Sequence, residues 1–355
     1  MRLPETLRAF GLPGLGIVGV LGAIACIVEA PRAGLTGWLA AAVLLQGIPV
    51  GGLILLAMMP LVKGQWEGQL RDSCEAAIGL WTLAIVAFVP VLLGIGAIYD
   101  WMSVTPATAF QRFWLSPVPF VLRTVLWFGA LGVIARALVG GRASQGICAL
   151  ALIVLVLGGS LMAVDWLMSL DVDFHSSGFG LQVLALETCT AYATILLVRL
   201  VSRPEPGAQR FGASSTAPAM LGALLLVFLL LWLYFQFMPY LITWSGNLPE
   251  GARWYAMRST GQWPWLLALA GAFGGIPLLA LLFTQVRKSP RALALACISV
   301  LAGKAIEFAW LAIPGRGPVA GLSFVFSTLA LGAFSLSYLA PATARWPQRR
   351  RRGRA

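Results

Sequence analysis

The sequence predicts an all-α polytopic membrane protein with about ten transmembrane helices. Hydrophobic residues make up 59% of its 355 residues, and charged residues only 11%. The mean hydropathy of +0.86 is far above that of a soluble domain. Apolar runs of about 20 residues, enough to cross a hydrocarbon core of roughly 30 Å as a helix, recur along the whole chain.

These apolar runs predict the helices in order. We expect them at about 10–29, 36–62, 76–99, 115–139, 146–166, 178–200, 217–245, 263–286, 291–313 and 318–340. The first run follows Arg2 and Arg8, as in a signal peptide, but it lacks a clear cleavage site of small residues, and we interpret it as a retained helix. The sequence thus predicts an integral membrane domain over 1–342 and a basic tail over 343–355.

The positive charges predict the orientation. The N-terminus, the even-numbered loops and the C-terminus carry most of the Lys and Arg residues, including six arginines from Arg345 to Arg354. Short loops rich in Lys and Arg stay in the cytoplasm, so both termini are predicted to be cytoplasmic. The net charge of +12 needs no nucleic acid, because a basic tail beside ten spans is better explained by anionic lipid.

Residues that could bind metals are too scattered to form a metal centre. The five cysteines show no CxxC or CxxCH spacing and are Cys26, Cys74, Cys148, Cys189 and Cys297. Iron–sulfur clusters, c-type haem and structural zinc require close thiolate or His/Cys ligands. A bis-histidine haem requires two histidines, and the sequence has one, His175. We therefore expect no metal site and no covalently bound cofactor in this chain.

Four ionisable residues are candidates for a proton path. Glu187 lies near the middle of the sixth predicted helix, where it must be protonated, paired or in contact with a polar cavity. Lys304 and Glu307 share a face of the ninth helix, and the simpler interpretation is a local ion pair. Glu75 is predicted at the inner end of the third helix, where it either caps the helix or forms the mouth of the path.

The most polar segment follows the fifth helix and contains the single histidine. Asp165, Asp171, Asp173 and His175 are predicted to form a polar patch at the outer face, as a proton exit or a quinone-side surface. Arg123, about two turns into the fourth helix, either reaches the outer surface or pairs inside the bundle.

Several motifs resemble, in chain order, the ActF membrane component of the bacterial alternative complex III, a quinol:cytochrome c oxidoreductase, and more distantly the NrfD/PsrC-type membrane proteins. The most specific are Asp165-Trp166 with Met168-Ser169-Leu170, and Asn247-Leu248-Pro249-Glu250. Further matching residues are Trp66, Arg71, Glu75, Pro90, Tyr99, Trp101, Arg123, Trp232, Trp254, Tyr255, Arg258, Lys288, Pro290, Glu307, Trp310 and Pro314. The chain departs from the family where Asp171-Val172-Asp173-Phe174 replaces a Pro-His-Trp run, and where Lys304 stands near a family arginine.

The resemblance implies two four-helix bundles plus two peripheral helices in the bacterial inner membrane. It also implies assembly with a quinol-binding NrfD-like subunit, c-type cytochromes and an iron–sulfur subunit, with the haem and iron–sulfur clusters in those partners and quinone nearby. This chain would then be a membrane subunit without a redox centre that contributes a proton path or a quinone-side surface. Two alternatives stay open: a proton-coupled secondary transporter, and a purely structural membrane anchor subunit.

Overall fold

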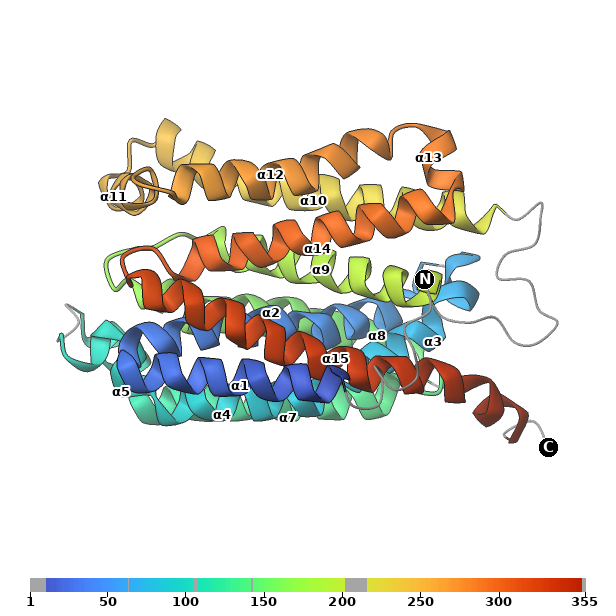
Figure 1. Ribbon diagram of the computed structural model, residues 1–355, viewed down its shortest axis with the longest axis horizontal. Coiled ribbons are helices and arrows are strands. Elements are labelled where there is room, and N and C mark those ends of the chain that lie inside the picture. The colour runs from blue at the N-terminus through green and yellow to red at the C-terminus, as the bar shows by residue number, and fades with distance from the viewer. Residues whose placement is uncertain (1–10, 63, 105–107, 142, 202–215, 353–355) are drawn as a thin grey trace.

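The computed structural model describes residues 11–62, 64–104, 108–141, 143–201 and 216–352. Within these residues ten helical segments are long and apolar enough to cross a membrane, and they run roughly along one axis (Figure 1). This confirms the prediction of an all-α polytopic membrane protein.

The ten spans begin within about five residues of the predicted starts, except for the third, which begins ten residues earlier. The eighth span ends six residues before its predicted end, and the helix of the last span continues twelve residues beyond its predicted end. They are α1 (Leu12–Glu29), α2 (Pro31–Met58), α3 with α4 (Trp66–Ile78 and Trp81–Leu93), α7 (Pro117–Leu138), α8 (Gln145–Trp166), α9 (Phe179–Val201), α10 (Ala217–Ser245), α12 (Trp263–Ala280), α14 (Pro290–Ala312) and α15 (Pro318–Arg352). Short helices join them: α5 (Ile95–Ile98), η2 (Asp100–Met102), α6 (Ala109–Trp114), η3 (Met168–Leu170), α11 (Pro249–Arg258) and α13 (Thr284–Lys288).

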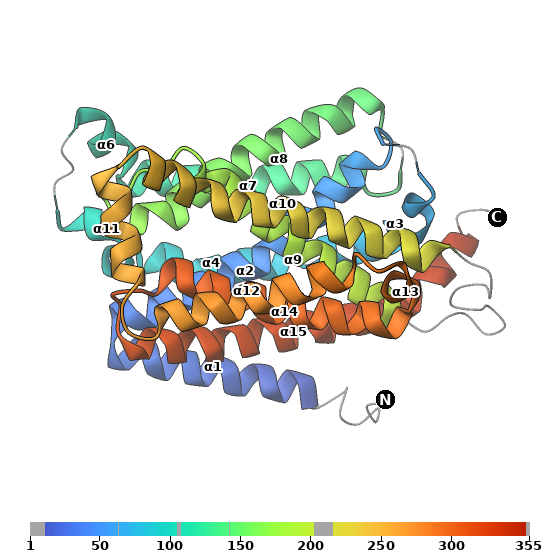
Figure 2. The same ribbon diagram turned by 90° about the horizontal axis from the view of Figure 1, so that it is seen from above.

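Helix α9 packs against α2, α8 and α3 as well as against α10 and α14, and α12 packs on α14. We call α2, α3 with α4, α7 and α8 the first group, and α9, α10, α12 and α14 the second group. Helices α1 and α15 pack against each other and against α2 (Figure 2). The two groups meet where α2 packs on α9, and these are the most buried of the ten spans.

The third span begins earlier than predicted and is interrupted. Helix α3 starts at Trp66, because the polar segment that we expected to be a loop is amphipathic and buries Trp66, Leu70 and Cys74. Glu75 therefore lies inside α3 and not in its first turn. The helix breaks at Gly79 and Leu80 before α4 continues the span.

Two glycines allow α2 and α9 to approach each other closely. A Cβ atom at Gly47 would lie 2.8 Å from Cγ of Glu187, and one at Gly51 would lie 2.3 Å from Cβ of Ala191. Small residues at helix interfaces bring membrane helices into direct backbone contact. The carboxylate of Glu187 is thereby held against α2.

The basic segment at the C-terminus continues the last span. Helix α15 runs without a loop from Pro318 through Arg352, and its end projects from the bundle (Figure 1). The predicted membrane domain and the tail as far as Arg352 are therefore continuous in backbone structure.

Candidate functional site in the bundle interior

Glu187 lies in the interface between the two helix groups. Its side chain is buried, with 3% of the residue exposed, and its Oε1 atom accepts a hydrogen bond of 2.5 Å from Nε2 of Gln46 on α2. The Oε1 atom of Gln46 in turn accepts a longer contact, of 3.4 Å, from the indole of Trp127 on α7. The hydrogen-bond partner of this carboxyl group is thus a neutral amide.

Further polar contacts follow along α7 toward the end of the bundle that contains η2 and η3. One turn from Trp127, the hydroxyl of Thr124 accepts a hydrogen bond of 3.1 Å from the indole of Trp166. The adjacent Arg123 donates from Nε to Asp165, at 2.5 Å. Two residues about one turn apart on α7 thus contact the polar groups in question: Trp127 contacts the partner of Glu187, and Arg123 contacts Asp165.

Asp165 is not part of a surface patch. Its side chain is fully buried, and it pairs with Arg123 and accepts a hydrogen bond of 2.9 Å from the indole of Trp114. The guanidinium group of Arg123 also lies 4.1 Å from the centroid of the Trp114 ring. Of the two interpretations of Arg123, the structure shows the internal pair, because a buried aspartate requires a partner.

The other three residues of the predicted patch do lie together at the surface. Arg253 of α11 pairs with Asp173 at 2.5 Å and lies 4.0 Å from Asp171. His175 lies 3.4 Å from Glu250 of α11. The patch therefore joins the segment after η3 to α11, and its side chains are exposed enough that its ion pairs add little stability.

Lys304 and Glu307 form the expected local ion pair on α14. Their Nζ and Oε2 atoms are 3.0 Å apart, and the side chains are 0% and 1% exposed. The indole of Trp232 on α10 donates to both carboxylate oxygens at 2.9 Å, and Nζ of Lys304 lies 3.0 Å from the centroid of the same ring. One tryptophan therefore contacts both charges, by a hydrogen bond and by a cation–π interaction.

Glu187 and the pair have different partners. Glu187 bonds to Gln46 on α2, whereas Lys304 and Glu307 bond to each other and contact Trp232 on α10. Among the described side chains no hydrogen bond or ion pair joins Glu187 to Lys304 or Glu307. Glu187 and the pair thus belong to separate clusters.

Glu75 lies at the opposite end of the bundle from Asp165. Its carboxylate accepts a hydrogen bond of 3.3 Å from the backbone N–H of Gly140 and is 3.9 Å from the guanidinium of Arg71. Its side chain is 10% exposed. This contact joins α3 to the turn between α7 and α8.

Arg258, which only the family resemblance had indicated, is a buried cation at the end of α11. It donates to the carbonyl oxygens of Trp254, Trp310 and Leu311, at 3.1, 3.3 and 2.8 Å, and it stacks on the Trp254 ring at 3.4 Å. The carbonyl end of α14 favours a positive charge. Burial lowers the pKa of Arg258 to about 9, which leaves it charged at neutral pH.

Sequence reasoning missed Gln46. The signal was present, because Gln46 is the one amide or charged side chain in the apolar run from Gly37 to Val62.

Among the described residues there is no group of three or more His, Cys, Asp or Glu side chains that could hold a metal ion, and the five cysteines are free and buried.

No protein-family model matches this chain, and no curated protein matches its sequence.

Proposed function

We propose that this chain is a membrane subunit of a respiratory quinol:electron-acceptor oxidoreductase of the alternative complex III type. In this function it has no redox centre of its own and provides a proton path, while electrons pass through companion subunits. The observation that carries the proposal is Glu187, a carboxyl group buried between two central spans and bonded to the neutral amide of Gln46. Ionisable residues placed so deep in a membrane are costly and are mostly functional.

The positions of the motif residues support the same proposal. Asp165 and Arg123 form one buried pair, and Glu307 with Trp232 belongs to another. Arg258 stacks on Trp254 and donates hydrogen bonds to carbonyl oxygens at the end of α14. Several residues that carry the family resemblance therefore make polar contacts in the interior.

The contacts also indicate a route for protons between Glu187 and Asp165. From Glu187 the polar groups lead through Gln46 to Trp127, and along α7 through Thr124 to Asp165. An indole N–H donates but does not accept. In the proposed path the carriers are consequently the two carboxyl groups and water between them.

The test uses the assembled complex in sealed vesicles. Glu187→Gln retains a side chain of similar shape and removes the exchangeable proton, so we expect electron transfer from quinol to continue while the protons released per electron decrease. Glu29→Gln is the matched control, because Glu29 lies exposed at the end of α1. An unchanged proton yield in Glu187→Gln would contradict the proton path.

A secondary transporter is the alternative that one observation favours. The span made by α3 and α4 is interrupted at Gly79 and Leu80, and broken helices are typical of transporters. Purification from native membranes separates the two functions. Haem-containing companions that co-purify support the respiratory subunit, whereas a chain purified without them supports transport. A purely structural anchor predicts that Glu187→Gln and Glu307→Gln alter assembly alone.

A further inference from the structure

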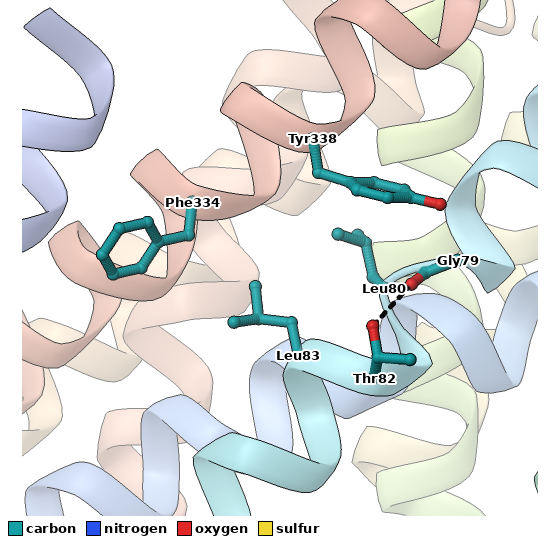
Figure 3. A pocket seen from close by; sticks show the side chains of 6 residues that line it. All are labelled: Gly79, Leu80, Thr82, Leu83, Phe334 and Tyr338. Carbon is teal, nitrogen blue, oxygen red and sulfur yellow. Dashed lines mark hydrogen bonds between the residues drawn. The ribbon is translucent and has the colours of Figure 1, made fainter. Parts of the chain in front are cut away.

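A pocket of about 340 Å³ lies between α15 and the junction of α3 with α4 (Figure 3). It is lined by Gly79, Leu80, Thr82, Leu83, Phe334 and Tyr338. Tyr338 lies directly against the break in the third span, since a Cβ atom at Gly79 would lie 1.9 Å from the Tyr338 hydroxyl. Glycine therefore allows the tyrosine ring to lie over the break.

The lining of the pocket suits a hydrocarbon chain. Its surface is nearly all apolar, and the Thr82 hydroxyl is already bonded to the Gly79 carbonyl at 3.3 Å. Thr82 and Tyr338 are exposed, so the pocket opens at the surface between two candidate membrane spans, where lipid chains are expected at its entrance.

A basic segment of the sequence follows the pocket-lining residues of α15. Helix α15 carries Phe334 and Tyr338 and then continues through Arg352. Arginines occupy positions 345, 349, 350, 351 and 352, and no acidic residue occurs in the sequence after Glu307. Position 345 follows Tyr338 by about two helical turns, or roughly 10 Å. Basic segments directly beyond a membrane span attract anionic lipid head groups.

We propose that this pocket binds an anionic phospholipid from the leaflet on the arginine side. One acyl chain lies against Phe334 and Leu83, and the phosphate is held by the arginine-rich end of α15. The site joins an apolar pocket to the basic charges of a single helix, so it selects for both chain and head group. It is independent of the proposed proton path.

The apolar half of the site is tested by filling it. Thr82→Phe places a ring in the pocket, and Val86→Phe, one turn further along α4 at a side chain 64% exposed, is the matched control. Native mass spectrometry with phosphatidylglycerol measures the lipid that stays bound to the purified full chain. We expect Thr82→Phe to lower its affinity at least about tenfold and Val86→Phe to leave it unchanged.

The charged half is tested by a triple variant, Arg345→Gln/Arg349→Gln/Arg352→Gln. Its control is Arg287→Gln/Lys288→Gln/Arg291→Gln, which removes three charges at the same end of the bundle, on α13 and α14. We expect the first variant to bind phosphatidylglycerol as weakly as phosphatidylcholine with the same chains, and the control to keep the preference.

Three results would overturn the proposal. They are equal affinity of the unaltered protein for phosphatidylglycerol and phosphatidylcholine, full phosphatidylglycerol binding by Thr82→Phe, and displacement of the phospholipid by a quinone with low micromolar affinity. The last result would assign the pocket to quinone. Because the arginine variant alters only the end of α15, its result stands even if Thr82→Phe fails to fold.

Discussion

The amide nitrogen of Gln46 lies 2.5 Å from the carboxylate of Glu187, across the interface that joins the two four-helix groups. Gly47 directly follows Gln46, and its missing side chain provides the space that the Glu187 side chain occupies. One short segment of α2 thus supplies both the hydrogen bond and the room for the acid.

Removal of the amide should destabilise the protein. In Gln46→Leu the buried carboxyl group of Glu187 loses its hydrogen-bond donor, and we expect the free energy of unfolding to fall by about 1–3 kcal/mol. Unfolding by denaturant in detergent micelles measures the change. The double variant Gln46→Leu/Glu187→Leu, which has apolar groups on both sides, should recover much of the loss. If it is no more stable than the single variant, the hydrogen bond is not the cause.

The contact between α2 and α9 should not tolerate a methyl group. Gly51→Ala places a Cβ atom 2.3 Å from that of Ala191, so the helices must separate, at a cost of about 1–3 kcal/mol. Gly271→Ala is the control, since a Cβ atom at this glycine of α12 meets nothing within 4 Å. The melting temperatures of the two variants provide the comparison, and equal values would contradict the close approach.

The ion pair of α14 should show strong coupling. Lys304→Met leaves Glu307 buried with an uncompensated charge, and we expect a loss of about 3–5 kcal/mol. Glu307→Gln leaves Lys304 in the same state. In the double variant no charge remains, while the Gln oxygen still accepts from Trp232. A double-mutant cycle measured by unfolding should show that most of the loss is recovered, and additive losses would exclude the pair as a unit.

Asp165 and Asp173 should respond differently to the same substitution. Asp165→Asn leaves the largely buried Arg123 without its anion, and we expect a loss of about 3 kcal/mol. Asp173→Asn disrupts a pair with side chains 65% and 58% exposed, so the loss should stay below about 1 kcal/mol. Added salt should reduce the second effect and not the first. Similar losses in both variants would place Asp165 back with the surface residues.

Hydrophobicity along the chain was sufficient to predict ten spans, because a span must be apolar over its whole length whatever it packs against. It did not predict the start of α3. Helix α3 is apolar on one side only, and the burial of its Trp66 and Leu70 depends on neighbouring helices. Charge and spacing were likewise sufficient for the pair of Lys304 and Glu307, since residues three apart on one helix meet without any tertiary contact.

The sequence by itself thus determined the membrane class, the number of spans and the local ion pair. Tertiary structure alone decided that Gln46 bonds to Glu187, that Asp165 pairs with Arg123 inside the bundle, and that Glu187 and Lys304 have different partners. The reason is physical. Membrane helices are apolar on every side, because lipid tails and protein interior are equally apolar, so a sequence does not show which side of a helix meets a neighbour. Only packing brings residues from different helices together.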